Sequence, residues 1–309
     1  MNTDQTQKLY VSVVIPIYNR ADFVALCLPP LLKQTYPLDR YEIILVDDGS
    51  TDDTVMRASD LTRDWAGNFR LIQKPNGGPA SARNAGLWVG VQAEIIAFID
   101  SDCVVGERWL EDLVEDLGNA KQQSGAVGIG GPIVSAGSES WVSRYIEFTG
   151  LIRHRVRRGQ VDYLTTANAA FYRQAILAVG GFDESCEFPG AEDPDLSFRL
   201  RQNGDVLAVT SRGSVQHHHR QTVGSLYRTL YRYGRGNFLM SYKWHNGRTP
   251  LVELIRHLGA IVLSPWLTLR RVRSTGFGWA LAFLPLTIIE HTGFVVGLCD
   301  GIRRGRRRN

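Results

Sequence analysis

Short apolar runs alternate with segments of helical periodicity through the first 105 residues, and this alternation strongly constrains the fold. The apolar runs are rich in β-branched residues and predict buried strands at 10–16, 41–46, 69–72 and 95–99. Helices are predicted between them, at 21–35, at 54–65 and from Ala80 onward, with Pro29-Pro30 expected to break or kink the first. Strands that alternate with helices form parallel sheets, so the sequence predicts a doubly wound, mostly parallel α/β fold.

Polar clusters follow three of the predicted strands, namely Tyr18-Asn19-Arg20, Asp47-Asp48 and Asp100-Ser101-Asp102. Ligands of open α/β sheets bind at the carboxyl ends of the strands. Two carboxylates one residue apart attract a hard divalent cation there, and the cation would attract a diphosphate. An ordinary strand-end turn uses the same residue types, so the aspartate pair alone leaves both interpretations open.

The two parts of the chain differ in charge. Residues 1–222 carry a net charge of −7, whereas residues 223–309 hold 14 Lys and Arg against three Asp and Glu, a net charge of +11. A chain of 309 residues with 44% hydrophobic residues suffices for one large α/β domain and a smaller part. We therefore predict two domains, 1–222 and 223–309, and expect the basic, apolar second one to face an anionic membrane and not nucleic acid.

Cysteine usage and the N-terminus predict the compartment. The four cysteines have no C-x-x-C spacing, which argues against a zinc ribbon or a disulfide framework and fits a reducing environment. The first eight residues lack the apolar core of a signal peptide. We therefore expect the 1–222 part to be cytoplasmic.

Two further polar clusters stand in the second half of the first domain. Glu192-Asp193 precede a helix predicted at 195–203, and His217-His218-His219 follow a strand predicted at 206–210. Acidic residues are favoured at helix N-termini, so the first cluster also has a purely structural interpretation. His217 and His219 share one face if their segment is a strand. The remaining elements predicted in this domain are helices at 109–121 and 174–179 and strands at 126–134 and 165–172.

Five motifs, in order, resemble the inverting family 2 glycosyltransferases of the GT-A fold, which use nucleotide-diphosphate sugars. They are Val14–Arg20, Val46–Asp52, Gly77–Gly86, Asp100–Asp102 and Gly190–Asp193. The resemblance covers about residues 9 to 222. It implies a GT-A fold, a Rossmann-like, doubly wound sheet. The Q-x-x-R-W motif of processive synthases is missing after Asp195, which favours transfer of a single sugar.

The resemblance also implies residue roles. Asp193 would be the catalytic base, with Glu192 beside it as an alternative base or an acceptor-orienting group. Mn²⁺ or Mg²⁺ would be held by Asp100, Asp102, His217 and His219, the two histidines being alternatives. The nucleotide-binding residues would be Pro16, Tyr18, Arg20, Asp47, Asp48, Arg83 and Asp100. Chemically, the metal offsets charge on the leaving phosphate and the base takes the proton of the acceptor hydroxyl.

The last part of the chain combines apolar and basic segments. A helix is predicted at 226–233, ended by Gly234 and Gly236, and apolar stretches follow at 257–269 and 277–298. The first stretch is too short to span a bilayer, and the second is long enough but is interrupted by Glu290. Interface anchors are expected at Trp266, Trp279, 270–273 and the polybasic run 303–308. We expect a helical, membrane-associated extension on the cytoplasmic face; a re-entrant hairpin, one true span and a dimerisation surface remain alternatives.

The sequence therefore predicts transfer of one sugar, with a UDP-sugar favoured, to a hydroxyl of a lipid-linked or cell-envelope glycan. A phospho-receiver module would leave the pairs at 100–102 and 192–193 unexplained, and a sugar nucleotidyltransferase would need a Gly-rich loop after the first strand. An inactive scaffold with the same fold is the remaining alternative.

Overall fold

The computed structural model describes residues 8–137, 140–186, 190–244, 249–266 and 277–305. Contacts within the chain divide it into two compact units. The first comprises the chain up to Val134, Arg153–Glu184 and Asp193–His217, and the second comprises Ser135–Ile152, Ser185–Glu192 and His218 onward. The domain boundary between residues 222 and 223 stays a prediction.

A seven-stranded sheet forms the centre of the first unit, in the order β11-β6-β10-β4-β1-β2-β3. Its parallel half consists of the four strands predicted from the apolar runs, β1 (Val11–Ile17), β2 (Tyr41–Asp47), β3 (Asn68–Gln73) and β4 (Ile95–Ile99). Ile17 pairs with Asp47 at the ends of β1 and β2, so the loops that follow these strands start side by side. The register thus gathers polar loops at one edge of the sheet.

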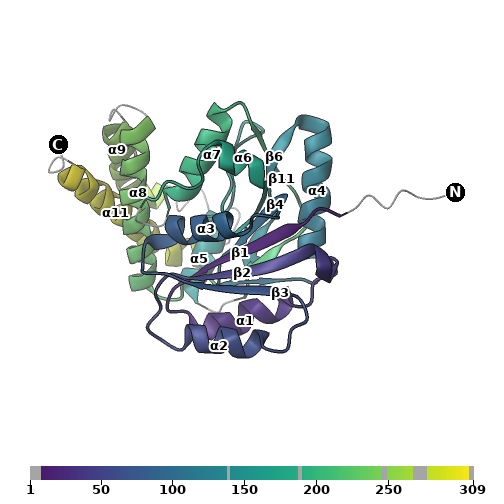
Figure 1. Ribbon diagram of the computed structural model, residues 1–309. Coiled ribbons are helices and arrows are strands. Elements are labelled where there is room, and N and C mark those ends of the chain that lie inside the picture. Colours follow the sequence, from purple (N-terminus) through teal and green to yellow (C-terminus); the bar gives the residue numbers. More distant parts are fainter. Residues whose placement is uncertain (1–7, 138–139, 187–189, 245–248, 267–276, 306–309) are drawn as a thin grey trace. The chain divides into compact units, whose positions relative to one another are not determined.

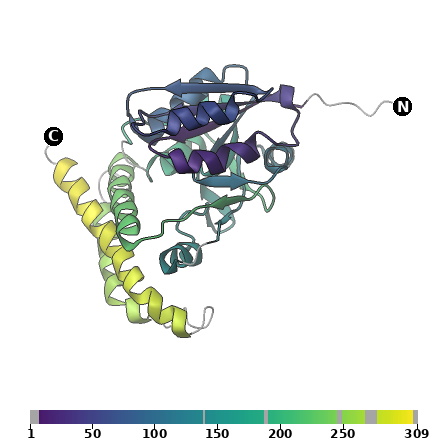
Figure 2. The same ribbon diagram turned by 90° about the horizontal axis from the view of Figure 1, so that it is seen from below.

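Helices cover both faces of this sheet (Figure 1). The helices α1 (Ala21–Leu31) and α2 (Thr54–Thr62) pack together on one face, and α3 (Gly78–Val89) lies on the other, as right-handed crossovers require (Figures 1 and 2). The first helix ends at Leu31, directly after Pro29-Pro30, and not at residue 35 as predicted. Prolines lack the amide hydrogen that continues a helix, which accounts for the earlier end.

The other half of the sheet is mixed. β10 (Asn168–Tyr172) runs antiparallel to both β4 and β6 (Ala126–Gly130), and β11 (Val206–Val209) pairs in parallel with β6. The helices α4 (Trp109–Ser124) and α6 (Arg173–Ala178) lie next to these strands in the chain, and α7 (Glu192–Gln202) precedes β11. The described residues also form two small sheets. One has the strand order β5 (Cys103–Val105), β12 (Val215–His217) and β7 (Ile133–Ser135), and the other pairs β8 (Arg155–Arg157) with β9 (Gln160–Tyr163).

One apolar core of the first unit lies between the sheet and the helices on the α3 face. Phe98 of β4 contacts Phe171 and Phe182 edge-on, with ring centroids 6.2 and 5.2 Å apart. Gly86 of α3 lies against Val14 of β1, where an added Cβ would stand 2.4 Å from a methyl carbon. The sheet and α3 are therefore held in close contact beneath the polar loops.

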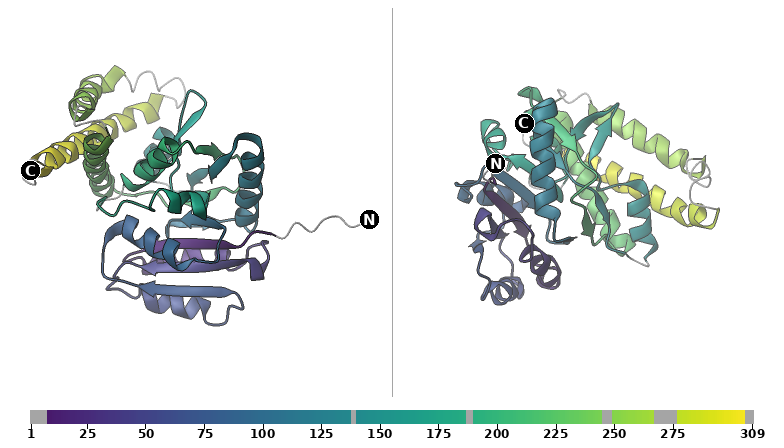
Figure 3. Two further views of the ribbon diagram at one scale, coloured as in Figure 1. Left: turned by 45° about the horizontal axis from the view of Figure 1, so that its top comes forward. Right: turned by 90° about the vertical axis from the view of Figure 1, so that its right-hand side faces the viewer.

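The second unit is helical, with α5 (Trp141–Thr149), α8 (Val223–Trp244), α9 (Thr249–Val262) and α11 (Phe277–Gly305). The C-terminal end predicted for the helix at 226–233 is wrong, because α8 continues through Gly234 and Gly236 to Trp244. These glycines serve close packing instead. α11 runs alongside α8 (Figures 2 and 3), and an added Cβ on Gly234 would lie 2.3 Å from the carbonyl oxygen of Phe294.

The predicted apolar stretches fall on α9 and α11. Within the described residues, one helical segment is long and apolar enough to cross a membrane by length and composition, Phe283–Arg304, with a mean hydropathy of 1.3. The expected anchors at 270–273 and the last residues of the polybasic run lie outside the described residues, as does the side chain of Trp279. Trp266 is described and is 53% exposed.

Candidate functional site

The loops after β1 and β2 are tied together by side-chain hydrogen bonds. Asn19, which adopts a positive φ of 49°, donates its amide to Ser50 Oγ at 2.8 Å and accepts from the Thr51 amide at 2.8 Å. The buried carboxylate of Asp47 accepts from the Ser50 amide at 3.1 Å. Asp47, a predicted nucleotide-binding residue, therefore uses its carboxylate to order this turn.

Asp48 joins the end of β2 to the start of α3. Its buried carboxylate accepts hydrogen bonds from the amides of Gly77 and Gly78, at 2.9 and 2.8 Å, and from Lys74 Nζ at 2.7 Å. These three donors hold both carboxylate oxygens, and Lys74 neutralises their charge. These contacts order the Gly77-Gly78 turn, and the role of Asp48 in nucleotide binding stays a prediction.

The side chains after β1 remain more accessible. Tyr18 is 48% exposed, and the half-buried Arg20 lies with its guanidinium 5.5 Å from the centre of the Phe23 ring. Pro16 is half-buried in β1. The exposed ring of Tyr18 can stack on a planar ligand, and the guanidinium of Arg20 supplies positive charge for an anionic one.

Asp100 follows β4 and forms an ion pair with Arg83 of α3. The distance from Arg83 Nη2 to Asp100 Oδ1 is 2.8 Å; the Arg83 side chain is buried, whereas that of Asp100 is 32% exposed. The two predicted nucleotide-binding residues are thus brought together. The pair leaves Asp100 accessible from solvent while Arg83 balances its charge.

Asp102 points to a different partner. The chain turns from β4 into β5 at this residue, and β12 pairs with β5 so that His217 stands opposite Cys103. His217 Nε2 lies 3.3 Å from Asp102 Oδ1, and both side chains are about nine-tenths buried. One ligand atom from each of Asp102, Cys103 and His217 falls within 4.8 Å of the others, a grouping that could hold a metal ion.

The electrostatic environment here favours a cation. Burial raises the pKa of the Cys103 thiol well above its usual value, and the negative charges of Asp102 and Asp100 raise this pKa further. Burial and the same two carboxylates likewise raise the pKa of Cys27. The thiols are therefore neutral without a bound cation, and the Asp102 carboxylate with the His217 imidazole offers oxygen and nitrogen ligands to a divalent cation.

Asp193, the predicted base, stands in the first turn of α7 against the segment before β10. Its carboxylate accepts from the Thr166 amide at 3.0 Å and from Thr166 Oγ1 at 2.7 Å. The neighbouring Thr165 amide donates to His154 Nδ1 at 2.9 Å, and His154 Nε2 lies 2.7 Å from the Gly131 carbonyl oxygen. A backbone amide can only donate and a carbonyl can only accept, so His154 is neutral with its proton on Nε2.

Glu192 and His219 have partners of their own in the second unit. Glu192 is buried, and its Oε2 accepts from the amides of Gly190 and Ala191 at 2.7 and 3.0 Å. His219 lies beyond the end of β12, and its Nε2 is 3.2 Å from Glu147 Oε2. Of the two histidines predicted as metal ligands, His217 contacts the predicted aspartate Asp102.

Three residues of the candidate site were not predicted from the sequence. Cys103 directly follows the aspartate pair, and that adjacency was an available signal. Thr166 and His154 carry no pattern that marks them, because their contacts are made by segments far apart in the chain.

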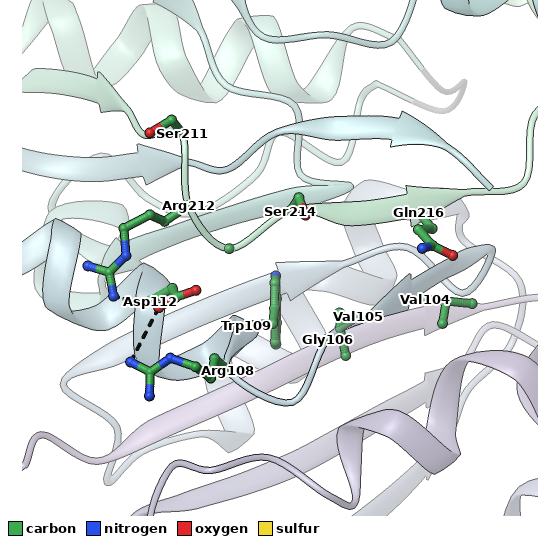
Figure 4. Close-up of a pocket in the computed structure, with 11 residues that line it drawn as sticks. Val104, Val105, Gly106, Arg108, Trp109, Asp112, Ser211, Arg212, Ser214 and Gln216 are labelled. Atoms are coloured by element: carbon green, nitrogen blue, oxygen red, sulfur yellow. Dashed lines mark hydrogen bonds and ion pairs between the residues drawn. The ribbon is translucent and has the colours of Figure 1, made fainter. Parts of the chain in front are cut away.

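A polar cavity of about 410 Å³ lies on another side of β5 and β12 (Figure 4). Gln216 lines it, whereas the next residue, His217, contacts Asp102. The guanidinium of Arg212 is held by Asp112, Glu115 and Asp116. No predicted site residue lines this cavity, which is bordered by Val104, Val105, Gly106, Arg108, Trp109, Asp112, Ser211, Arg212, Gly213, Ser214 and Gln216.

Comparison with known sequences gives one family match and several relatives. Residues 12–180 match the profile described as glycosyl transferase family 2. The glycosyltransferase AglE of Haloferax volcanii is 28% identical over 231 residues, covering 74% of this chain and 72% of that protein. EpsJ, a glycosyltransferase of Bacillus subtilis, is 34% identical over 66% of this chain and 59% of its own length. The pre-mycofactocin glycosyltransferase of Mycobacterium tuberculosis is 32% identical over 68% of this chain but only 43% of its own.

Solved structures share the fold at low sequence identity. A mannosyltransferase from Pyrobaculum calidifontis, in complex with GDP-Man and Mn²⁺, has a TM-score of 0.66 at 17% identity, covering 96% of this chain and 88% of that one. GalNAc-T7, solved with UDP, GalNAc and Mn²⁺, has a TM-score of 0.56 at 18% identity over 75% of this chain and 48% of its own. The predicted GT-A-like α/β fold with a mostly parallel sheet is confirmed.

Proposed function

Because this chain belongs to glycosyl transferase family 2, we propose that it transfers one sugar from a nucleotide-diphosphate sugar to a hydroxyl acceptor with inversion at the anomeric carbon. The observation that carries the proposal is the carboxylate of Asp193, held by two donors of Thr166 in a fixed orientation. The acceptor oxygen attacks the anomeric carbon, its proton passes to Asp193, and the bond to the diphosphate breaks with its electron pair on the leaving oxygen. A single displacement of this kind inverts the configuration.

A metal ion is proposed at Asp102 and His217. The ligand atoms, their burial and the negative charge around them fit Mn²⁺ or Mg²⁺, and two solved neighbours contain Mn²⁺. Such an ion, when bound, offsets the charge that develops on the leaving diphosphate. Asp100, predicted as a second ligand, is instead proposed to act with Arg83 at the donor, since these two side chains already form an ion pair.

The nucleotide is proposed to lie over the loops after β1 and β2. Tyr18 offers an exposed ring for stacking and Arg20 a cation, next to Pro16. Asp47 and Asp48 shape the floor of this region through their contacts with Ser50, Gly77 and Gly78. The preference for UDP stays a prediction, since the solved neighbours contain GDP-Man or UDP.

The acceptor is proposed to be a lipid-linked or cell-envelope glycan at the cytoplasmic face of a membrane. The apolar segment Phe283–Arg304 and the net charge of +11 over residues 223–309 support membrane association of the second predicted domain. Residues 1–222 are proposed as the catalytic domain. Glu192 is proposed to order the turn before α7 through its backbone contacts.

The test is calorimetric binding of UDP, GDP and dTDP to the full chain, with and without Mn²⁺. Metal-dependent binding of one nucleotide, lost in Asp102→Ala, is expected. With the matching donor sugar, Asp193→Asn should lower the rate of nucleotide release by about 10²–10⁴-fold while nucleotide affinity stays unchanged. Failure of all three nucleotides to bind the folded protein would support an inactive scaffold instead, and equal rates for Asp193→Asn would reject Asp193 as the base.

A further inference from the structure

Seven large apolar side chains of α9 and the residues directly after it are exposed. Their exposed fractions lie between 46% and 77%, and they are Leu251, Val252, Ile255, Leu258, Val262, Leu263 and Trp266. Spacings of three, four and seven residues place them on one stripe of the helix, here named the α9 stripe. Monomeric soluble proteins rarely expose so much contiguous apolar surface, so the stripe indicates a contact with another apolar phase.

The opposite side of α9 is already packed. His257 is 5% exposed; its ring stacks on that of Phe294 with centroids 4.7 Å apart, and its Nδ1 lies 2.9 Å from His291 Nδ1. Ser264 is 1% exposed on the same side. These contacts fix the rotation of α9 against α11. The α9 stripe is therefore an exposed face of a helix whose opposite side packs on α11.

Charge indicates which apolar phase would cover this face. The last 87 residues carry a net charge of +11, and the sequence after Trp266 continues to Arg270-Arg271-Val272-Arg273, outside the described residues. A second copy of the chain on this face would bring two strongly positive regions together. An anionic bilayer would satisfy both features, because its acyl chains cover apolar residues while its headgroups attract cations.

The packing of α8 on α11 resembles that of helices in lipid. Gly293, Gly297 and Gly301 recur every four residues on α11 and face α8. An added Cβ on Gly297 would lie 2.0 Å from the carbonyl oxygen of Tyr231, and one on Gly301 would lie 2.8 Å from Phe238 Cβ. Small residues that let two backbones approach this closely are enriched where membrane helices meet.

We propose that α9 lies in the interfacial layer of an anionic lipid bilayer, with the α9 stripe facing the acyl chains. Trp266 would then stand at the headgroup level, where tryptophan is enriched. Binding of this face to lipid does not depend on sugar transfer, and the two can be measured separately.

A fluorescent reporter on the stripe tests this directly. The full chain carrying Cys299→Ser and Val262→Cys is labelled with the environment-sensitive dye NBD and placed in vesicles by detergent removal. Cys27, Cys103 and Cys186 are buried, so the new thiol is the accessible one among the described cysteines. The matched control carries Val91→Cys in place of Val262→Cys, because Val91 is 64% exposed in the first unit.

In vesicles of phosphatidylcholine with phosphatidylglycerol, the probe at 262 should emit at shorter wavelength and be quenched most by lipids labelled near the headgroup. The shift should be smaller in pure phosphatidylcholine, and the probe at 91 should emit as in water in both. A probe at 262 that stays in water, or that responds equally to both lipids, overturns the proposal. A shift without lipid, together with a doubled mass by light scattering, overturns it in favour of self-association. Calorimetric nucleotide binding of the same protein reports separately on the catalytic unit.

Discussion

Thr166 is the residue on which the position of the proposed base depends. It donates from its amide and its hydroxyl to the two oxygens of Asp193, which fixes the plane of the carboxylate. Neither oxygen is thereby prevented from accepting a further proton, since each carboxylate oxygen has two acceptor sites. The geometry leaves the Asp193 carboxylate oriented and able to accept the proton of an acceptor hydroxyl.

We predict that Thr166→Val lowers the rate of nucleotide release by about 10–100-fold, because a hydrogen bond to a charged group contributes about 1.5–3 kcal/mol. Thr166→Ser retains the hydroxyl and should restore most of the rate. Steady-state kinetics should place the loss in kcat and not in KM for the donor. Equal rates for the valine and serine variants would mean that the hydroxyl does not position the base.

The neutral imidazole of His154 makes the segment before β10 sensitive to acid. Burial lowers its pKa below the usual value of 6.5. The unfolded chain therefore takes up a proton near pH 6.5 that the folded chain binds only at lower pH, and stability falls as the pH drops from 6.5 towards the folded pKa.

We predict that His154→Gln, although less stable at neutral pH, loses stability less steeply below pH 6.5 than the unchanged chain does. Urea unfolding at a series of pH values measures this slope. His257, whose pKa burial lowers to about 4, acts in the same direction and should supply part of the slope that remains. Parallel curves for the two proteins would show that His154 does not carry this acid sensitivity.

Among the elements, the four parallel strands were predicted closely, because each is a continuous apolar run bounded by polar residues. The three-residue strands β5 and β12 were not predicted, since so short a segment has no periodicity of its own. They matter nevertheless, because their pairing brings His217 to Asp102. Sequence reasoning thus found the aspartate pair but could not tell that its members face different partners.

The α8 helix shows why a glycine was wrongly predicted to end a helix. Gly234 was expected to end the helix, yet it lies where α11 crosses, and its missing side chain allows the contact. A glycine that ends a helix and one that admits a neighbour look alike in sequence. The difference depends on a partner about sixty residues further along the chain.

We predict that Gly297→Ala destabilises the helical unit, because its Cβ would lie 2.0 Å from a backbone oxygen. The cost should be about 1–3 kcal/mol, as for other overpacked sites. Gly259→Ala on α9 is the matched control, since no atom lies within 4 Å of its added Cβ. The thermal midpoint should fall for the first variant only, and a fall of equal size in both would point to a general effect of helix glycines.

At the scale of the whole molecule, the two predicted domains carry net charges of opposite sign. An acidic region of net charge −7 is followed by one of net charge +11. An anionic surface would attract the second and repel the first. This polarity would favour an approach to the headgroups through the second predicted domain.

We predict that binding of the full chain to phosphatidylglycerol-containing vesicles weakens as NaCl rises from about 0.1 M to about 0.5 M, because screening shortens the range of charge attraction from about 10 Å. Co-flotation with vesicles measures the bound fraction. Neutral vesicles serve as the control and should show little salt dependence. Salt-independent binding to both kinds of vesicle would mean that apolar insertion alone holds the protein on the membrane.

The packing of α5 on α11 has a consequence for how the protein is made. Tyr145 of α5 hydrogen-bonds Glu290 of α11, and Val142, Ile146, Phe283 and Leu286 share one apolar cluster. At a synthesis rate of about 5–20 residues per second, roughly 10–30 s separate the emergence of α5 from that of its cover. The strands of the parallel half can pair during this interval. The cluster around α5 includes Leu226 and Leu230 of α8, which emerge earlier, but it stays incomplete until Phe283 and Leu286 of α11 are made. The nascent chain therefore exposes this part of α5 until the ribosome delivers α11.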